Sequence, residues 1–357
     1  MLIENLLILP FTISAILCYC ITPIVIKLAW KFDIIDDPKK NKHPKVIHTK
    51  PTPRGGGAAI FLSIVVASIL LLPQDKHLAG ILGGSSILVL MGILDDKYNI
   101  NPYIRLLIQF LAASIPIAAG IGIAFWNSPF GIIDLSYPRI DFFLLGKTRS
   151  IWLLPDIFAL FWIVMLMNFI NWGAKGVDGQ LSGVVTIAGL VIAILSLKFS
   201  ADITEWPVTI LAAILSGAYL GFLPWHTYPQ KIMPGFSGSN LAGFFLGVLS
   251  ILTTTKVGTL FIVLGIPLID SLYTLIRRIS EGKSPVWGDR KHLHHRLLDS
   301  GWSKKKIAFF YWISTAMLGA IALWANSTWK LYTIIGLIFF VLGLILWLRS
   351  QSPQQYN

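Results

Sequence analysis

Charged residues are scarce in this chain. Of its 357 residues only 13% are Asp, Glu, Lys or Arg, about half the share found in a typical soluble domain. Apolar residues make up 55%, and the mean hydropathy is +0.71. This balance excludes both an ordinary soluble protein and a disordered one.

Cysteine is also rare. The two cysteines, Cys18 and Cys20, lie in one apolar run and are too few for a disulfide framework or a zinc site. We interpret them as small apolar side chains within a helix. The chain has no low-complexity stretch, and it shows no internal repeat of the kind that marks many transporters.

Apolar runs that carry almost no charge recur along the whole chain. A helix crosses a hydrocarbon core about 30 Å thick with about 20 residues. The predicted spans are 5–28, 55–73, 79–94, 103–124, 154–172, 181–197, 207–225, 241–255, 257–276, 307–325 and 331–348. The first is too long for a signal-peptide core and lacks a basic flank, so we expect a retained helix. The sequence predicts an all-α, polytopic integral membrane protein with about eleven transmembrane helices in a single membrane domain, 1–357.

Lysine and arginine set the predicted orientation. The loops 31–54, 95–102, 173–180, 226–240 and 277–306, with the C-terminal tail, hold 20 of them, and the opposite loops hold 7. The positive-inside rule therefore places the N-terminus outside and the C-terminus in the cytoplasm. The net charge of +12 is explained by topology and by attraction to anionic membrane lipid, so no nucleic-acid partner is expected. The external loop 125–153 contains an alternating apolar stretch, Ile132–Tyr137, which predicts a short hairpin.

Six of the seven histidines and most aspartates near helix ends fall in the predicted cytoplasmic loops. Ionisable residues close to the bilayer are costly and mark functional sites. A transporter needs a site near the midplane that both sides can reach. The one-sided clustering therefore favours an enzyme at the cytoplasmic interface, with a transporter as the weaker alternative.

Asp95 and Asp96 form the strongest local signal. Two adjacent carboxylates emerge as a helix leaves the membrane, and a divalent cation or a shared proton would relieve their repulsion. Because Mg²⁺ usually combines one or two carboxylates with phosphate oxygens, the pair suggests phosphoryl chemistry. A solvated helix cap is the alternative.

A second signal lies in residues 289–296. Three imidazoles and three cations within eight residues predict an anion site that could bind a diphosphate. Its members are Asp289, Arg290, Lys291, His292, His294, His295 and Arg296. A zinc site and a plain basic loop that fixes topology are the alternatives.

A third signal joins Asn168 and Asn171 to the following loop. Two amides three residues apart share a helix face, and Lys175 and Asp178 follow where the helix ends. Polar amides inside an apolar span need partners, so we expect a polar groove or, alternatively, packing between helices. The glycine-rich loop 226–240 could offer backbone N–H groups to phosphate.

Taken together, these motifs resemble the polyprenyl-phosphate N-acetylhexosamine-1-phosphate transferases, a membrane family within glycosyltransferase family 4. The residues that carry the resemblance, in chain order, are Asp37, Pro38, His48 and 51–56; then Gly92, Asp95, Asp96, Pro102, Arg105 and Gln109; then Asp270, Asp289 and 292–298. The last group is the most specific and resembles the branch that uses UDP-N-acetylglucosamine.

The resemblance implies transfer of a sugar-1-phosphate from a UDP-sugar to undecaprenyl phosphate in the bacterial inner membrane, with release of UMP and a need for Mg²⁺ or Mn²⁺. It implies that Asp95, Asp96 and Asp178 act in catalysis and at the metal. It also implies that Lys45, His48 and Arg54 hold an anionic substrate, and that His292, His294 and His295 lie by the nucleotide sugar. Whether the protein forms a homodimer is left open by the sequence.

Two departures separate the chain from the family pattern. Lys175 begins a Lys-Gly-Val-Asp-Gly run where the family has Asp-Gly-x-Asp-Gly, and Phe236 replaces an aspartate that is a metal ligand in the family. Phe236 cannot bind Mg²⁺, so Asp95, Asp96 and Asp178 would have to hold the ion with substrate oxygens. The alternatives are the muramoyl-pentapeptide nucleotide as donor, and a relative that binds lipid or nucleotide sugar without turnover.

Overall fold

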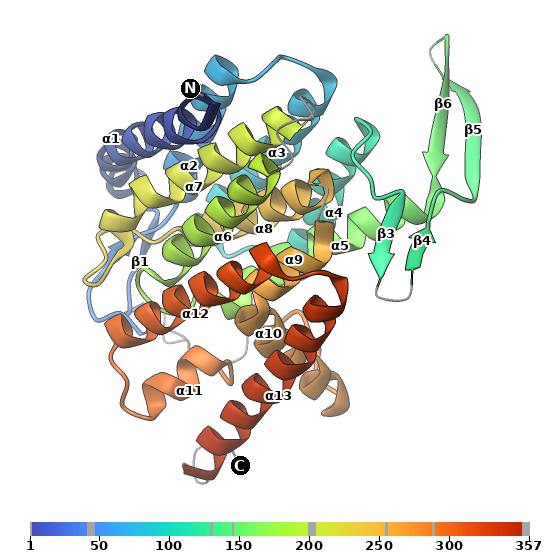
Figure 1. The fold of residues 1–357 in the computed structure, drawn as a ribbon. Helices are drawn as coiled ribbons and strands as arrows, with labels where there is room; N and C mark the ends of the chain where they lie inside the picture. The colour runs from blue at the N-terminus through green and yellow to red at the C-terminus, as the bar shows by residue number, and fades with distance from the viewer. Residues whose placement is uncertain are drawn as a thin grey trace.

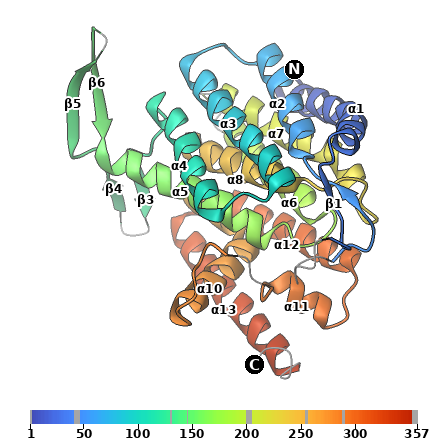
Figure 2. The same cartoon turned by 180° about the vertical axis from the view of Figure 1, so that it is seen from behind.

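A computed structural model describes residues 2–40, 47–128, 131–144, 146–198, 205–253, 256–287 and 290–351. Helices dominate these residues, and Figures 1 and 2 show them from opposite sides. The helices of the N-terminal part are a π-helix Glu4–Ile8, α1 Leu9–Lys31, α2 Gly57–Leu71, α3 Lys76–Tyr98, α4 Pro102–Ala118, α5 Leu153–Gly173 and α6 Gln180–Leu197. Those that follow are α7 Trp206–His226, α8 Gly235–Leu252, α9 Lys256–Val263, α10 Gly265–Ser280, α11 Leu293–Asp299, α12 Lys304–Trp324 and α13 Ser327–Gln351.

Within the described ranges, the strands form three separate antiparallel pairs. β1 Ile35–Asp36 pairs with β2 Thr52–Pro53 between α1 and α2. Between α4 and α5, β3 Phe125–Ser128 pairs with β4 Gly131–Asp134, and β5 Arg139–Leu144 pairs with β6 Lys147–Trp152. The one hairpin predicted for loop 125–153 is thus two hairpins, which stand off to one side of the helices in both views (Figures 1 and 2).

The helical architecture confirms a polytopic membrane protein. Within the described residues, eight helices are long and apolar enough to cross a membrane, or nine if the bent pair α9–α10 counts as one span. Helices α2 and α4 are apolar but shorter than 18 residues. Each of the eleven predicted spans therefore has a helix, but the count of eleven crossings and the orientation of the termini stay predictions.

Two predicted boundaries were wrong. The predicted span 257–276 is broken near Leu264, where α9 and α10 meet at 90°. The predicted span 241–255 begins six residues earlier, because α8 starts at Gly235 inside the predicted loop 226–240. Gly235 has a positive φ of +70°, a conformation that favours glycine and lets the chain turn sharply into the helix.

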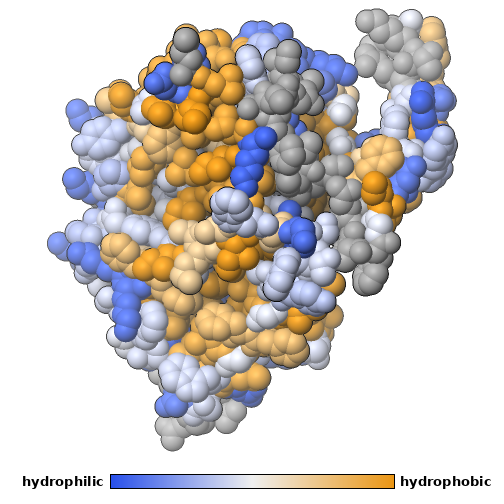
Figure 3. All heavy atoms as spheres, viewed as in Figure 1, coloured by the Kyte–Doolittle hydropathy of each residue, from blue (hydrophilic) through white to orange (hydrophobic). Residues whose placement is uncertain are grey.

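The core lies around α8, of whose apolar window 94% is buried inside the protein. It packs against α3 and α5, and α6 and α7 pack on each other beside it (Figure 1). Hydrophobic side chains also cover much of the helical part of one outer face (Figure 3). An apolar exterior of this extent is expected where lipid, rather than water, surrounds the helices.

Candidate active site

One pocket of about 760 Å³ collects most of the predicted site residues. Each of the five predicted cytoplasmic loops contributes to its lining, so these loops meet at one end of the helices. The predicted residues that line it are His48, Arg54, Asn168, Asn171, Lys175, Asp178, His292, His294 and His295. Two further predicted residues, Lys45 and Asp289, lie outside the described residues.

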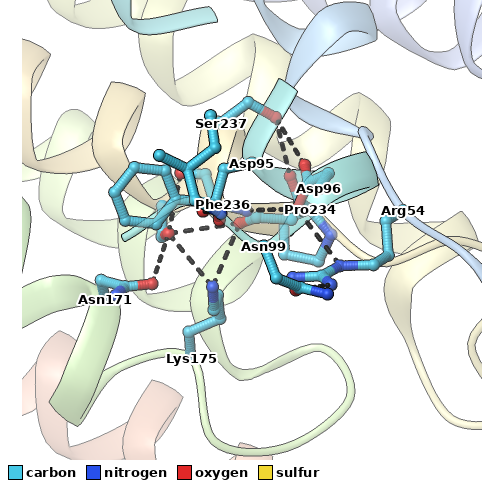
Figure 4. Close-up of polar contacts among 12 residues, drawn as sticks. Arg54, Asp95, Asp96, Asn99, Asn171, Lys175, Pro234, Phe236 and Ser237 are labelled. Carbon is cyan, nitrogen blue, oxygen red and sulfur yellow. Dashed lines mark hydrogen bonds and ion pairs between the residues drawn. The ribbon is translucent and has the colours of Figure 1, made fainter. Parts of the chain in front are cut away.

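Asp96 lies beneath this pocket at the N-terminus of α8. Its carboxylate accepts a hydrogen bond of 2.9 Å from the backbone N–H of Phe236 and one of 3.3 Å from the Ser237 hydroxyl. The guanidinium Nε of Arg54, which lines the pocket, lies 3.2 Å from Asp96 Oδ1 (Figure 4). A carboxylate is stabilised at a helix N-terminus by the free N–H groups and the helix dipole. Asp96 thus joins α3, α8 and the Arg54 loop.

Asp95 closes the turn between α3 and α4. The backbone N–H of Ile100 donates a 3.0 Å hydrogen bond to Asp95 Oδ1, and Arg105 Nη1 lies 3.4 Å from Oδ2. Asn99, in the left-handed region at φ +50°, makes this turn possible and accepts a hydrogen bond from Arg54. Both carboxylates are buried, and each orients an arginine that lines the pocket.

Lys175 enters the pocket from the loop between α5 and α6 (Figure 4). Its ammonium lies 3.2 Å from the carbonyl of Gly235 and 3.3 Å from the Ser239 hydroxyl. Burial lowers the pKa of Lys175 to about 8, and the Asp96 carboxylate nearby opposes that shift. Since a pKa of about 8 leaves the side chain mostly protonated at neutral pH, Lys175 adds a cation to the pocket.

The histidine motif packs directly on this loop. The rings of His292 and His294 stack at 5.7 Å between centroids, and His294 contacts His295 at 4.3 Å. A Cβ built on Gly176 would lie 2.0 Å from the His294 ring, so only glycine fits there. Arg296 is buried and donates to the carbonyl of Lys291 instead of lining the pocket.

The two asparagines make hydrogen bonds between helices as well as lining the pocket. Asn168 on α5 donates a 2.8 Å hydrogen bond to Gln109 on α4, and Gln109 donates to Asn240 on α8. Asn171 accepts a 2.7 Å hydrogen bond from Ser239. Asn168 and Asn171 therefore fit both interpretations, since they line a polar groove and also connect helices.

Comparisons with known proteins identify the family of this chain. The model of glycosyl transferase family 4 matches residues 78–254, which run from α3 to α8. A Bacillus subtilis protein named probable undecaprenyl-phosphate N-acetylglucosaminyl 1-phosphate transferase is 32% identical over 94% of this chain and 90% of its own length. The chain belongs to glycosyl transferase family 4.

Other relatives carry related names. A decaprenyl-phosphate N-acetylglucosaminephosphotransferase of Mycolicibacterium smegmatis is 27% identical over 86% of this chain and 79% of its own length. The undecaprenyl-phosphate alpha-N-acetylglucosaminyl 1-phosphate transferase of Escherichia coli K12 is 25% identical over 89% of this chain and 84% of its own length. The resemblance to this family that the motifs indicated is thereby confirmed.

The acidic residues do not fit a divalent cation shared by the three predicted ligands. Asp95 and Asp96 already pair with arginines, and Asp178 Oδ1 lies 3.4 Å from the ammonium of Lys304. In the part of the chain that the structure describes, no three His, Cys, Asp or Glu side chains are placed to hold a metal ion. A role for Mg²⁺ or Mn²⁺ stays a prediction.

Three residues at the site were not predicted as site residues. Arg105 was noted as part of the Asp-Asp segment, and its position one turn into the next helix could have marked it as a cation of the site. Trp287 and Lys304 gave no signal, because an aromatic residue and a lysine in a basic loop are common. Trp287 lines the pocket, and Lys304 contacts Asp178 from the start of α12.

Proposed function

We propose that this protein transfers N-acetylglucosamine-1-phosphate from UDP-N-acetylglucosamine to a polyprenyl phosphate, releasing UMP. The observation that carries the proposal is the convergence of Arg54, Arg105 and Lys175 with three histidines in one pocket beside apolar helices. The names of the similar proteins support the acceptor and the transferred group. In a bacterial cell, this reaction would take place at the cytoplasmic face of the inner membrane.

The reaction is a phosphoryl transfer. An oxygen of the lipid phosphate attacks the β-phosphorus of the donor, and the bond from that phosphorus to the bridging oxygen breaks. The bridging oxygen keeps the electron pair and leaves as part of UMP. Such transfers depend mainly on positioning and on neutralising phosphate charge.

The residues of the pocket suit these two tasks. Arg54 and Arg105 present planar guanidinium groups that bind phosphate oxygens in pairs, and Asp96 and Asp95 hold them in place. We assign the donor to the side formed by His292, His294 and His295, where imidazole nitrogens can bond sugar hydroxyls or phosphate. Asp95 and Asp96 then act by positioning the arginines.

A relative without turnover is the second candidate. It is favoured by the pairing of every predicted acidic ligand with a cation and by Phe236 in place of an acidic residue. The muramoyl-pentapeptide nucleotide remains an alternative donor for a working enzyme. These three possibilities differ in which UDP-sugar is converted, if any.

A donor panel separates them. Purified protein in detergent is incubated with undecaprenyl phosphate and one UDP-sugar at a time, with Mg²⁺, with Mn²⁺ or with EDTA, and UMP is measured. We expect UMP from UDP-N-acetylglucosamine only when the lipid is present. UMP from the muramoyl-pentapeptide nucleotide instead would change the donor, and no UMP under any condition would contradict the proposal.

A further inference from the structure

The two residues that depart from the family pattern both belong to the cationic lining of the pocket. Lys175 brings an ammonium into the lining, and the centroid of the Phe236 ring lies 4.9 Å from the guanidinium carbon of Arg105. The Phe236 side chain therefore stacks on a cation that it helps to orient. One departure adds a positive charge and the other holds one in place.

The contacts of Lys175 leave it able to bind a ligand. An ammonium has three N–H donors, and two point at the Gly235 carbonyl and the Ser239 hydroxyl. No further hydrogen-bond partner of Lys175 is found within the described segments. These neutral partners fix the ammonium at the N-terminus of α8 without cancelling its charge.

The charged groups around Lys175 favour binding of an anion. Asp96, Arg54, Asp95 and Arg105 all lie within electrostatic range of the ammonium. The two carboxylates are committed to the two arginines, so the ammonium charge is left for a ligand. The three cations and two carboxylates together leave one net positive charge, which attracts a diphosphate and repels a divalent cation.

We propose that Lys175, together with Arg54 and Arg105, binds the diphosphate of the donor in the place of a divalent cation, so that nucleotide binding needs no metal. The proposal rests on the proposed function only for the identity of the donor. Lysine and arginine clamps neutralise transferring phosphates in the same way that metal ions do. It also accounts for the lysine in the Lys-Gly-Val-Asp-Gly run.

Binding of UDP, measured by isothermal titration calorimetry on the purified protein, tests this inference. We expect the Kd for UDP in EDTA to agree within about threefold with that in Mg²⁺. Loss of one charge-assisted hydrogen bond should weaken binding about tenfold or more in Lys175→Gln. Lys175→Arg should keep most of the affinity, and Lys283→Gln, an exposed lysine paired with Glu281, should bind like the natural protein.

Tightening of UDP binding by Mg²⁺ of about tenfold or more would overturn the inference, and so would unchanged binding in Lys175→Gln. The inference and the proposed function can fail separately. If UDP binds in EDTA in a way that depends on Lys175, but no donor yields UMP, the inference is supported and the proposed function is contradicted. Folding of each variant is checked by its thermal unfolding. If Lys175→Gln does not fold, UDP affinity in Lys175→Arg and in the natural protein, each with and without Mg²⁺, still decides the question.

Discussion

The imidazole Nδ1 of His292 lies 3.0 Å from Oδ2 of Asp270, a residue 22 positions earlier in α10. Asp270 Oδ1 accepts a second hydrogen bond, 2.8 Å long, from the backbone N–H of Leu293. The fully buried carboxylate therefore holds the start of α11 and fixes the ring of a pocket histidine. Asp270 thus connects α10 to a histidine that lines the pocket.

We expect Asp270→Leu to lower the free energy of unfolding by about 2 kcal/mol or more, because two buried donors lose their acceptor. Asp270→Asn keeps an acceptor for the Leu293 N–H and should fold, but it should weaken UDP-N-acetylglucosamine binding by releasing His292. Thermal unfolding and calorimetric binding measure the two effects. Asp299→Asn, which breaks only a surface pair with Arg290, is the control. A fully stable and active Asp270→Leu protein would refute this role.

Arg54 and Asp96 should behave as a coupled pair. Arg54→Gln leaves a buried carboxylate without its cation, which we expect to destabilise the protein by about 3 kcal/mol. Asp96→Asn relieves that penalty, so the double variant should be more stable than Arg54→Gln alone. A thermodynamic double-mutant cycle measures the coupling. Additive effects of the two substitutions would show that the pair does not stabilise the fold.

Gly235→Ala should disrupt the site. A Cβ at this position would lie 2.0 Å from Oδ2 of Asp96, and the φ of +70° adds backbone strain. Gly282 has a similar φ of +67° but no atom within 4 Å of a built Cβ, so Gly282→Ala reports the strain alone. We expect Gly235→Ala to lose activity and stability and Gly282→Ala to lose little of either. Equal effects in both variants would mean that the contact with Asp96 is unimportant.

The charge of Lys175 predicts a pH dependence. With a pKa lowered to about 8 by burial, the side chain is protonated at pH 7 and loses its proton as the pH rises through 8. UDP should therefore bind progressively more weakly as the pH rises from 7 to 9, and bound phosphate should shift the midpoint of this loss upward. Lys175→Arg stays charged throughout, so its affinity should not fall between pH 7 and 9. A parallel decline in both proteins would assign the effect to another group.

The sequence predicted the helices and the convergence of the loops better than it predicted the roles of single residues. Runs of apolar residues locate membrane helices because each span must be uniformly hydrophobic. Asp95 and Asp96 were found for the same reason, since carboxylates next to such a run stand out. Their partners could not be predicted in the same way. Arg54 comes from another loop, and the N–H groups of 226–240 were expected to bind phosphate, whereas that of Phe236 donates to Asp96.

The break between α9 and α10 escaped prediction for a related reason. Residues 257–276 are mostly apolar and carry a single charged residue, Asp270, so the composition of the run does not reveal a 90° bend. Likewise, comparison with the family pattern shows Phe236 and Lys175 only as positions that lack the family's aspartates. The structure gives each a contact, on Arg105 and at Ser239, that a linear motif does not contain.

The fate of the donor phosphates tests the account most directly. UDP-N-acetylglucosamine labelled with ³²P at the β-phosphorus is incubated with undecaprenyl phosphate and the protein, and the lipid and aqueous products are separated. Transfer of sugar-1-phosphate predicts that the β-label moves to the lipid fraction, whereas the same donor labelled at the α-phosphorus yields labelled UMP. Both labels remaining in the aqueous nucleotide, whether as UDP or as unreacted donor, would contradict the account.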